Sequence, residues 1–242
     1  MNTPRDRAAV ADAPAYTGAE VARLLALPAA TVRAWFFGMP NSTEREFERV
    51  LTPADPRRRL LSFVNLCEAH VLAIVRRSRR VPLPSVRMAM SHLAEKHQVE
   101  HPLLSRRLVT DTQGGLFVDD GDGRLLQMTR SGQYAMREVL EQALSRIDWS
   151  ERDTPVRLFP VPAYAGSPDT APRQVAIDPA IRFGRPILLG AGVTTEVISD
   201  RFRAGDTIDE LASDFGVDCA AIEEAIRFQQ RVEAGSEQRA TA

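Results

Sequence analysis

The chain has 242 residues and a mass of 26.8 kDa, with 44% apolar and 26% charged residues. This composition is typical of a globular chain of one or two domains and excludes extensive disorder. Charged residues interrupt every apolar stretch well before about 18 positions, so we expect no membrane span and no signal peptide. The two cysteines, Cys67 and Cys219, lie far apart in predicted helices, which predicts buried thiols, no disulfide and a cytoplasmic location.

The net charge of −1 conceals a gradient along the chain. Residues 1–100 contain 15 basic and 10 acidic residues, whereas residues 151–242 contain 10 basic and 15 acidic residues. This polarity favours contact of the N-terminal part with a polyanion and of the C-terminal part with a cationic or neutral partner. The alternative is a drift of surface charge without function.

The N-terminal part has the pattern of two short helices joined by a tight turn. Thr17 and Glu20 have the spacing of a capping box that starts the first helix, and apolar residues follow at helical intervals. The second helix, at about 28–36, repeats this apolar spacing and begins with a proline. A charged connector at 42–59 and two further helices, starting at about 62 and 86, follow.

The middle of the chain changes period. Short β-like runs at 107–110, 116–118 and 125–128, separated by Gly- and Asp-rich turns, predict a meander. An amphipathic helix then runs from about 139 to 149. Five prolines between residues 153 and 172 predict an extended linker with one strand at 156–159.

The last part combines short strands with three helices. Strands are predicted at 175–177 and 187–189, followed by helices at 194–203, 208–215 and 219–230. The fold class is therefore α+β, mainly α with a small β-meander. The predicted parts are a flexible arm (1–15), a winged helix-turn-helix domain (16–100), a meander plus helix (101–152), a Pro-rich linker (153–173), a tri-helical domain (174–231) and a tail (232–242).

The first helix pair carries a nucleic-acid signature. Its motifs, YTGAEVARLL at 16–25 and TVRAW at 31–35, have helix-turn-helix spacing, in which the second helix enters the major groove. At these residues the sequence resembles the MerR-type winged-helix family, over about residues 15–95. The resemblance implies that Trp35 is mostly core and that DNA-backbone contacts come from recognition-helix and wing residues: Thr31, Arg33, Arg45, Arg57, Arg58 and Arg59. The alternative is a helical hairpin whose Arg33 is merely solvated.

Other features of the MerR family are missing from the sequence. A meander stands where the long dimerisation helix of MerR-type activators is expected, which argues against ligand-triggered activation. Cysteine pairs for metal sensing are absent, and His92, His97 and His101 do not share one helix face. We therefore expect neither a metal nor a cofactor.

The C-terminal residues carry the most specific resemblance. The segment IDP at 177–179, the segment FGRP at 183–186 and the run GDTIDELASDFG at 205–216 closely resemble a short bacterial domain of unknown function that is frequent in antitoxins. Residues 175–230 contain 5 arginines and 10 acidic residues, so this domain is expected to repel phosphate. A protein interface, either for dimerisation or for a toxin, is the favoured interpretation, and a purely structural domain is the alternative.

Together these parts look like a VapB-type antitoxin. The resemblance implies neutralisation of a PIN-domain ribonuclease toxin by occlusion, and binding to promoter DNA as a homodimeric autorepressor. VapB-type antitoxins commonly direct an arginine at the toxin's acidic metal site, for which the candidates outside the predicted cores are Arg152, Arg157, Arg173, Arg231 and Arg239.

Two other functions remain open at this stage. One is a ligand-responsive MerR-like transcription regulator without a toxin partner, with residues 103–149 as the effector pocket. The other is an adaptor that binds no nucleic acid. Enzymatic activity is not expected, because the sequence has no Gly-rich phosphate loop, no nucleophile elbow and no paired histidines.

Overall fold

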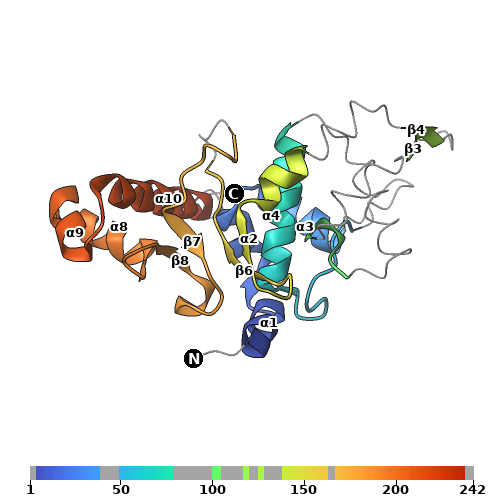
Figure 1. The fold of residues 1–242 in the computed structure, drawn as a ribbon, viewed down its shortest axis with the longest axis horizontal. Coiled ribbons are helices and arrows are strands. Elements are labelled where there is room, and N and C mark those ends of the chain that lie inside the picture. Colours follow the sequence, from blue (N-terminus) through green and yellow to red (C-terminus); the bar gives the residue numbers. More distant parts are fainter. Residues whose placement is uncertain are drawn as a thin grey trace. The chain divides into compact units, whose positions relative to one another are not determined.

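The computed structural model describes residues 4–38, 49–78, 100–104, 117–119, 125–127, 138–162 and 167–237. The chain divides into two compact units, one formed by residues 1–66 and 146–242 and the other by residues 67–145. Helices and short antiparallel strands make up the described residues, which confirms the α+β prediction (Figure 1). None of the described helices is long and apolar enough to span a membrane.

The N-terminal arm is not an irregular segment. Helix α1 covers Pro4–Asp12, and its Ala11 is fully buried. The helix packs against strand β6 (Pro155–Leu158) in the same unit. The prediction of a flexible arm missed this helix because Ala11 is its buried side chain among the described positions, and one small residue gives a weak apolar pattern.

The helix-turn-helix pair forms as the sequence predicts. Helix α2 covers Gly18–Leu24 and helix α3 covers Ala29–Phe37. The predicted capping box is confirmed: the Glu20 carboxylate accepts a hydrogen bond from the Thr17 amide at 2.7 Å, and the Thr17 hydroxyl accepts one from the Glu20 amide at 3.2 Å. Pro28 is the N-cap of α3. A helix makes no internal hydrogen bond to the amide at this position, so the missing N–H of proline costs nothing there.

A small sheet and one asparagine connect this pair to the next helix. Strand β1 (Tyr16–Thr17) pairs antiparallel with β2 (Leu60–Leu61), just before helix α4 (Phe63–Ser78). The Asn65 side chain accepts hydrogen bonds from the amides of Ala54 and Ser62, at 2.8 and 3.1 Å, and donates one to the Thr52 carbonyl at 2.8 Å. Asn65 therefore fixes the end of the connector to the start of α4.

A five-stranded antiparallel sheet forms the centre of the first unit. Its strand order follows the chain: β5 (Ile147–Trp149), β6, β7 (Val175–Ile177), β8 (Pro186–Leu188) and β9 (Val193–Thr194). The prediction that the preceding helix reaches Trp149 is wrong, because Ile147 already pairs with Leu158 as a strand. Apolar residues continue at helical spacing from 139 to 147, beyond the end of the helix. A single buried strand residue such as Ile147 fits the helical spacing as well as the alternation of a strand, so the pattern did not show where the helix ends.

The Pro-rich segment begins with the predicted strand, here β6, but residues 168–170 form a turn, and Arg146 holds the segment in place. The Arg146 side chain is 1% exposed and donates hydrogen bonds to four backbone carbonyls, at 2.6–3.4 Å: Phe159, Pro168, Ala171 and Pro172. Burial, together with the nearby charge of Arg173, lowers the pKa of Arg146 to about 10. Strand β6, at the start of this segment, belongs to the central sheet.

The three C-terminal helices are confirmed. They are α8 (Thr195–Arg203), α9 (Ile208–Phe215) and α10 (Cys219–Glu237), the last longer than predicted. Helix α10 packs against α8 and α9 and also contacts strands β7 and β8 (Figure 1). A buried hydrogen bond of 2.8 Å joins the Thr195 hydroxyl to the Gln229 side chain, so α8 and α10 are linked by polar as well as apolar contacts.

Cys219 departs from the expectation of a buried thiol. Cys67 is buried, and burial raises its pKa well above the ordinary value, whereas Cys219 is exposed. The Cys219 thiol donates a hydrogen bond to Asp209 at 3.3 Å, and this contact raises its pKa. Cys219 is the first residue of α10, so helical periodicity alone did not reveal its exposure.

The second unit is described in part. It contains most of α4, the 3-10 helix η1 (Pro102–Leu104) and the antiparallel hairpin of β3 (Phe117–Asp119) and β4 (Leu125–Gln127). The hairpin matches the second and third predicted runs of the meander. The run at 107–110 and the helix predicted from residue 86 lie outside the described residues.

Candidate nucleic-acid interface

A basic groove lies beside helix α3. It has a volume of about 800 Å³, and its lining includes Arg33, Arg49, Arg57 and Arg59, with no acidic residue among the described lining positions. All of these residues belong to the first unit. A concave surface with one sign of charge concentrates an anionic ligand, so the groove suits a phosphate backbone.

Helix α3 is held so that Arg33 faces solvent. Val32, Trp35 and Phe36 are buried at 0–2% exposure, while Arg33 between them is exposed. The Trp35 carbonyl also accepts hydrogen bonds from the amides of Val50 and Leu51, at 2.8 and 2.9 Å. The core role that the resemblance implies for Trp35 is therefore confirmed, and the connector returns to α3 through backbone contacts.

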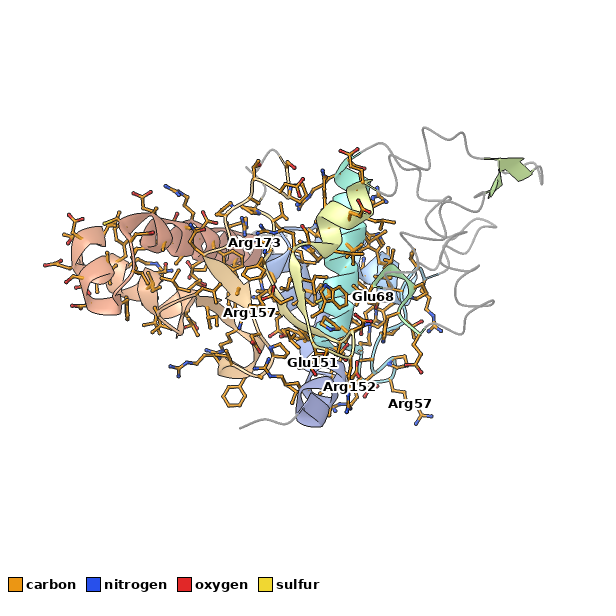
Figure 2. All side chains as sticks on the ribbon, viewed as in Figure 1. Arg57, Glu68, Glu151, Arg152, Arg157 and Arg173 are labelled. Atoms are coloured by element: carbon orange, nitrogen blue, oxygen red, sulfur yellow. The ribbon has the colours of Figure 1, made fainter. Side chains whose placement is uncertain are left out.

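A tight turn positions the triple arginine. The Asp55 carboxylate accepts hydrogen bonds from the backbone amides of Arg57 and Arg58, at 3.0 and 2.9 Å, and Asp55 also exchanges backbone hydrogen bonds with Leu60. Arg59 has a φ of +56°, and its guanidinium lies 4.6 Å from the centre of the Phe37 ring. The Arg57 side chain extends away from the fold (Figure 2). The turn thus fixes the backbone of its arginines, and the Phe37 ring holds the Arg59 side chain.

Most of the predicted DNA contacts can be placed. Arg33, Arg57 and Arg59 line one groove, Arg58 is exposed on the same turn, and Thr31 is half-buried in the first turn of α3. Arg45 lies outside the described residues. Sequence reasoning missed Arg49 and Phe37, which also line the groove. The aromatic pair at the end of α3 was the available signal for Phe37, and nothing distinguished Arg49 from the other charged connector residues.

The arginines considered for a toxin site have different surroundings. Arg157 forms ion pairs with Asp148 at 3.4 Å and with the buried Asp178 at 3.5 Å. Arg173 lies 5.1 Å above the Phe159 ring. Arg157 is half-buried and is labelled among the strands in Figure 2, whereas Arg173 is exposed.

Arg231 and Arg152 complete the described candidates. Arg231 lies 4.7 Å above the Phe228 ring. Arg152 is exposed on the turn between β5 and β6, where the Ser150 hydroxyl accepts hydrogen bonds from the amides of Arg152 and Thr154. Arg239 lies outside the described residues. Among the described candidates, Arg152 is therefore the one that lies on an exposed turn, with no aromatic or ionic contact to the described residues.

The histidines form no metal site among the described residues. The His101 Nδ1 atom lies 3.3 Å from the carboxylate of Glu68, which is 3% exposed. His92 and His97 lie outside the described residues. No group of three metal-ligating side chains occurs in the part of the chain that the structure covers.

Comparison with known proteins decides the family. Residues 14–90 match the family described as "Putative DNA-binding HTH domain", and residues 175–228 match "Protein of unknown function (DUF433)". The protein named "Putative antitoxin VapB45" from Mycobacterium tuberculosis is 31% identical over 224 residues, which are 85% of this chain and 90% of that protein. The chain belongs to the VapB-type antitoxin family. It is an antitoxin with a helix-turn-helix DNA-binding domain.

A second curated protein and a solved structure from Mycobacterium tuberculosis also resemble this antitoxin along most of its length. "Uncharacterized protein Rv2308" is 25% identical over 228 residues, which are 91% of this chain and 92% of that protein. The crystal structure of Rv2018 has a TM-score of 0.58 and 25% identity, and it covers 88% of this chain and 97% of that one. The likeness therefore extends across the helix-turn-helix, the central sheet and the C-terminal helices.

Proposed function

We propose that this antitoxin neutralises a PIN-domain ribonuclease toxin by occluding its active site, and that it represses its own promoter as a cytoplasmic homodimer. One observation carries the proposal: the arginine groove beside α3 and the acidic C-terminal helices are parts of one compact unit. A single folded body can therefore offer a basic surface to DNA and a different surface to a protein.

The DNA surface is the groove beside α3. Arg33 and the arginines of the Asp55 turn supply several positive charges on a concave face, and neutralising phosphates is the largest sequence-independent contribution to DNA affinity. We assign phosphate contacts to Arg33, Arg57, Arg58 and Arg59, with Thr31 and Arg45 as the further contacts that the MerR-like arrangement implies. A homodimer would present two such grooves to a palindromic site.

The toxin surface lies elsewhere. The C-terminal domain has twice as many acidic residues as arginines, so it is poorly suited to phosphate. Arg152 is the described arginine best placed to reach an acidic metal site, because a turn displays it and its side chain is exposed. A guanidinium among carboxylates can form paired, charge-assisted hydrogen bonds, and its charge competes with a catalytic cation.

Affinity purification from the native host, followed by native mass spectrometry, tests the proposal. The expected result is a stoichiometric complex with a small PIN-domain protein whose ribonuclease activity returns when the antitoxin is removed. The Arg152→Ala variant should inhibit that activity less well, whereas Arg227→Ala, which removes a charge from α10, should inhibit it as the wild type does. Recovery of a homodimer alone would overturn the toxin assignment and favour a ligand-responsive MerR-like regulator.

A further inference from the structure

Phe183 is displayed to solvent on a short loop. Its side chain is 96% exposed, and it is the middle residue of the 3-10 helix η3 (Arg182–Gly184), between strands β7 and β8. The other large apolar side chains that are exposed in the described part of the chain, Val197 and Phe202, reach only 45% and 38%. A single exposed apolar side chain is common on protein surfaces, so a role for Phe183 as an interface anchor depends on how its loop is held.

The backbone around Phe183 adopts a conformation that a bulky residue rarely takes. Arg182, Phe183 and Gly184 have φ values of +49°, +57° and +73°. Only glycine adopts this left-handed region without a steric cost, so two of the three residues are strained. Such strain persists only where surrounding contacts determine the conformation.

Contacts from three directions hold the loop. The buried Tyr16 hydroxyl donates a hydrogen bond to the Gly184 carbonyl at 3.2 Å, and the Gly184 amide donates one to the Ile181 carbonyl at 3.0 Å. The Arg182 guanidinium donates a hydrogen bond to the Gly192 carbonyl at 3.3 Å. The loop is therefore fixed while the Phe183 ring remains free for a partner, which reduces the entropy lost on binding.

The loop also carries positive charge within an acidic domain. Arg182 and Arg185 flank the loop and are both exposed, and Arg185 forms an exposed ion pair with Glu196 at 3.1 Å. A pocket of about 170 Å³ lies beside Phe183, and its lining contains two arginines, Arg23 and Arg185, and one carboxylate, Glu20. An aromatic side chain between arginines, next to a small pocket, fits a protein surface with an apolar depression bordered by carboxylates.

We propose that Phe183, with Arg182 and Arg185, anchors the PIN-domain toxin, by inserting its ring into an apolar pocket with an acidic border. This inference rests on the proposed function and identifies a contact separate from the arginine that occludes the active site. DNA is disfavoured, because the domain that presents the loop has a net negative charge. Pairing of two such loops across a twofold axis is disfavoured, because it would bring arginines of like charge together. Contact of the loop with another patch of a second copy is an outcome that the test distinguishes.

The test compares single-residue variants bound to the PIN-domain protein that the wild-type chain captures. Phe183→Ala should weaken binding at least tenfold, while Phe183→Trp should retain binding within about threefold, as expected for an aromatic anchor. Phe202→Ala is the matched control, since it removes a less exposed phenylalanine from the same domain, and it should change the affinity less than twofold. Because the ring is exposed, Phe183→Ala should unfold at the wild-type temperature.

Each outcome decides between the two proposals. If the wild type captures a PIN-domain protein that Phe183→Ala binds equally well, the anchor is wrong and the proposed function stands. If the wild type captures no such protein, both are wrong. If Phe183→Ala instead weakens binding to a promoter fragment, or shifts the monomer–dimer equilibrium, while toxin affinity is unchanged, the loop contacts DNA or a second copy and the anchor is overturned.

Discussion

The hydroxyl of Tyr16 donates a hydrogen bond to the carbonyl of Gly184, 168 positions later in the chain. Tyr16 is the first residue of strand β1, which precedes the helix-turn-helix, and Gly184 is the last residue of the 3-10 helix that displays Phe183. Helix α2 also packs against α10 within the same unit. The DNA-binding helices and the C-terminal domain are thus joined by a polar contact as well as by apolar packing.

Substitutions at this contact should destabilise the first unit by different amounts. Tyr16→Phe removes the hydrogen bond and should lower the free energy of unfolding by about 1 kcal/mol. Gly184→Ala should cost roughly 2 kcal/mol or more, because its Cβ would lie 1.9 Å from the Tyr16 hydroxyl oxygen at a φ of +73°. Urea denaturation measures both. Gly216→Ala, at a similar φ of +66° but with open space around its Cβ, is the control and should cost less.

Substitution of Arg146 should lower the free energy of unfolding more than substitution of Arg173, the exposed arginine at the same Phe159 ring. Arg146→Met leaves four carbonyls near the Pro-rich segment without their donor, so a loss of about 3 kcal/mol or more is expected. Arg173 is the other arginine near the Phe159 ring, and it is exposed. Arg173→Met should therefore lower the free energy of unfolding by less than about 1 kcal/mol. Chemical denaturation compares the two, and equal losses would contradict the anchoring role of Arg146.

Arg33→Ala should weaken DNA binding about equally for all sequences, as the loss of one phosphate contact does. The slope of the logarithm of the binding constant against the logarithm of salt concentration should become shallower by about 1. Arg227→Ala removes the same charge from α10, where Arg227 pairs with Glu223, and should leave the slope unchanged. Titration of a promoter fragment at several salt concentrations measures both variants, and identical slopes would remove Arg33 from the interface.

The C-terminal helices should lose stability in acid through Glu210. The amide and hydroxyl of Thr207 donate hydrogen bonds to the Glu210 carboxylate, both at 2.8 Å, and lower its pKa below the usual value. A carboxyl whose pKa is lower in the folded state stabilises the fold above its unfolded pKa of about 4.3, and this contribution is lost as the pH falls through the folded pKa.

The Glu210→Gln variant isolates this effect. Its unfolding temperature should lie below that of the wild type at pH 7, and the difference should shrink as the pH falls below about 4. Glu151→Gln, on the exposed β5–β6 turn, controls for the general loss of a carboxylate. A difference between the wild type and Glu210→Gln that stays constant from pH 7 to pH 3 would show that the carboxylate does not titrate as expected.

Local signals in the sequence were enough to predict the helix-turn-helix and the C-terminal helices. These signals are the capping box of Thr17 and Glu20 and the glycines between the C-terminal helices. Each acts over three or four residues, so it can be recognised from the sequence without knowledge of the fold. The strand at Ile147 and the role of Arg146 depend on partners 11 to 26 positions away. Nothing local distinguishes them from the helix before them.

The candidate site could be predicted only in part for the same reason. The positions of Arg33 and Arg57 in the motifs predicted their place at the site. Arg49 joins Phe37 in the groove because the connector folds back on Trp35 through backbone hydrogen bonds, which the sequence does not reveal. The loop that displays Phe183 is held by Tyr16, which hydrogen-bonds to Gly184 from 168 positions earlier in the chain. Sequence patterns assign residues to helices and strands, but contacts between segments that are distant in the chain determine which side chains lie on the same surface.

The central sheet also constrains how this protein can be divided. Residues 174–231 look like a self-contained module, yet β7 pairs with β6, where Leu158 lies opposite Ile177, on the other side of the Pro-rich segment. An excised fragment that starts at residue 174 would leave that edge of β7 without its neighbour, and unpaired strand edges recruit other chains. Such a fragment is expected to aggregate, whereas one that starts before Arg146 keeps both the strand and its arginine brace.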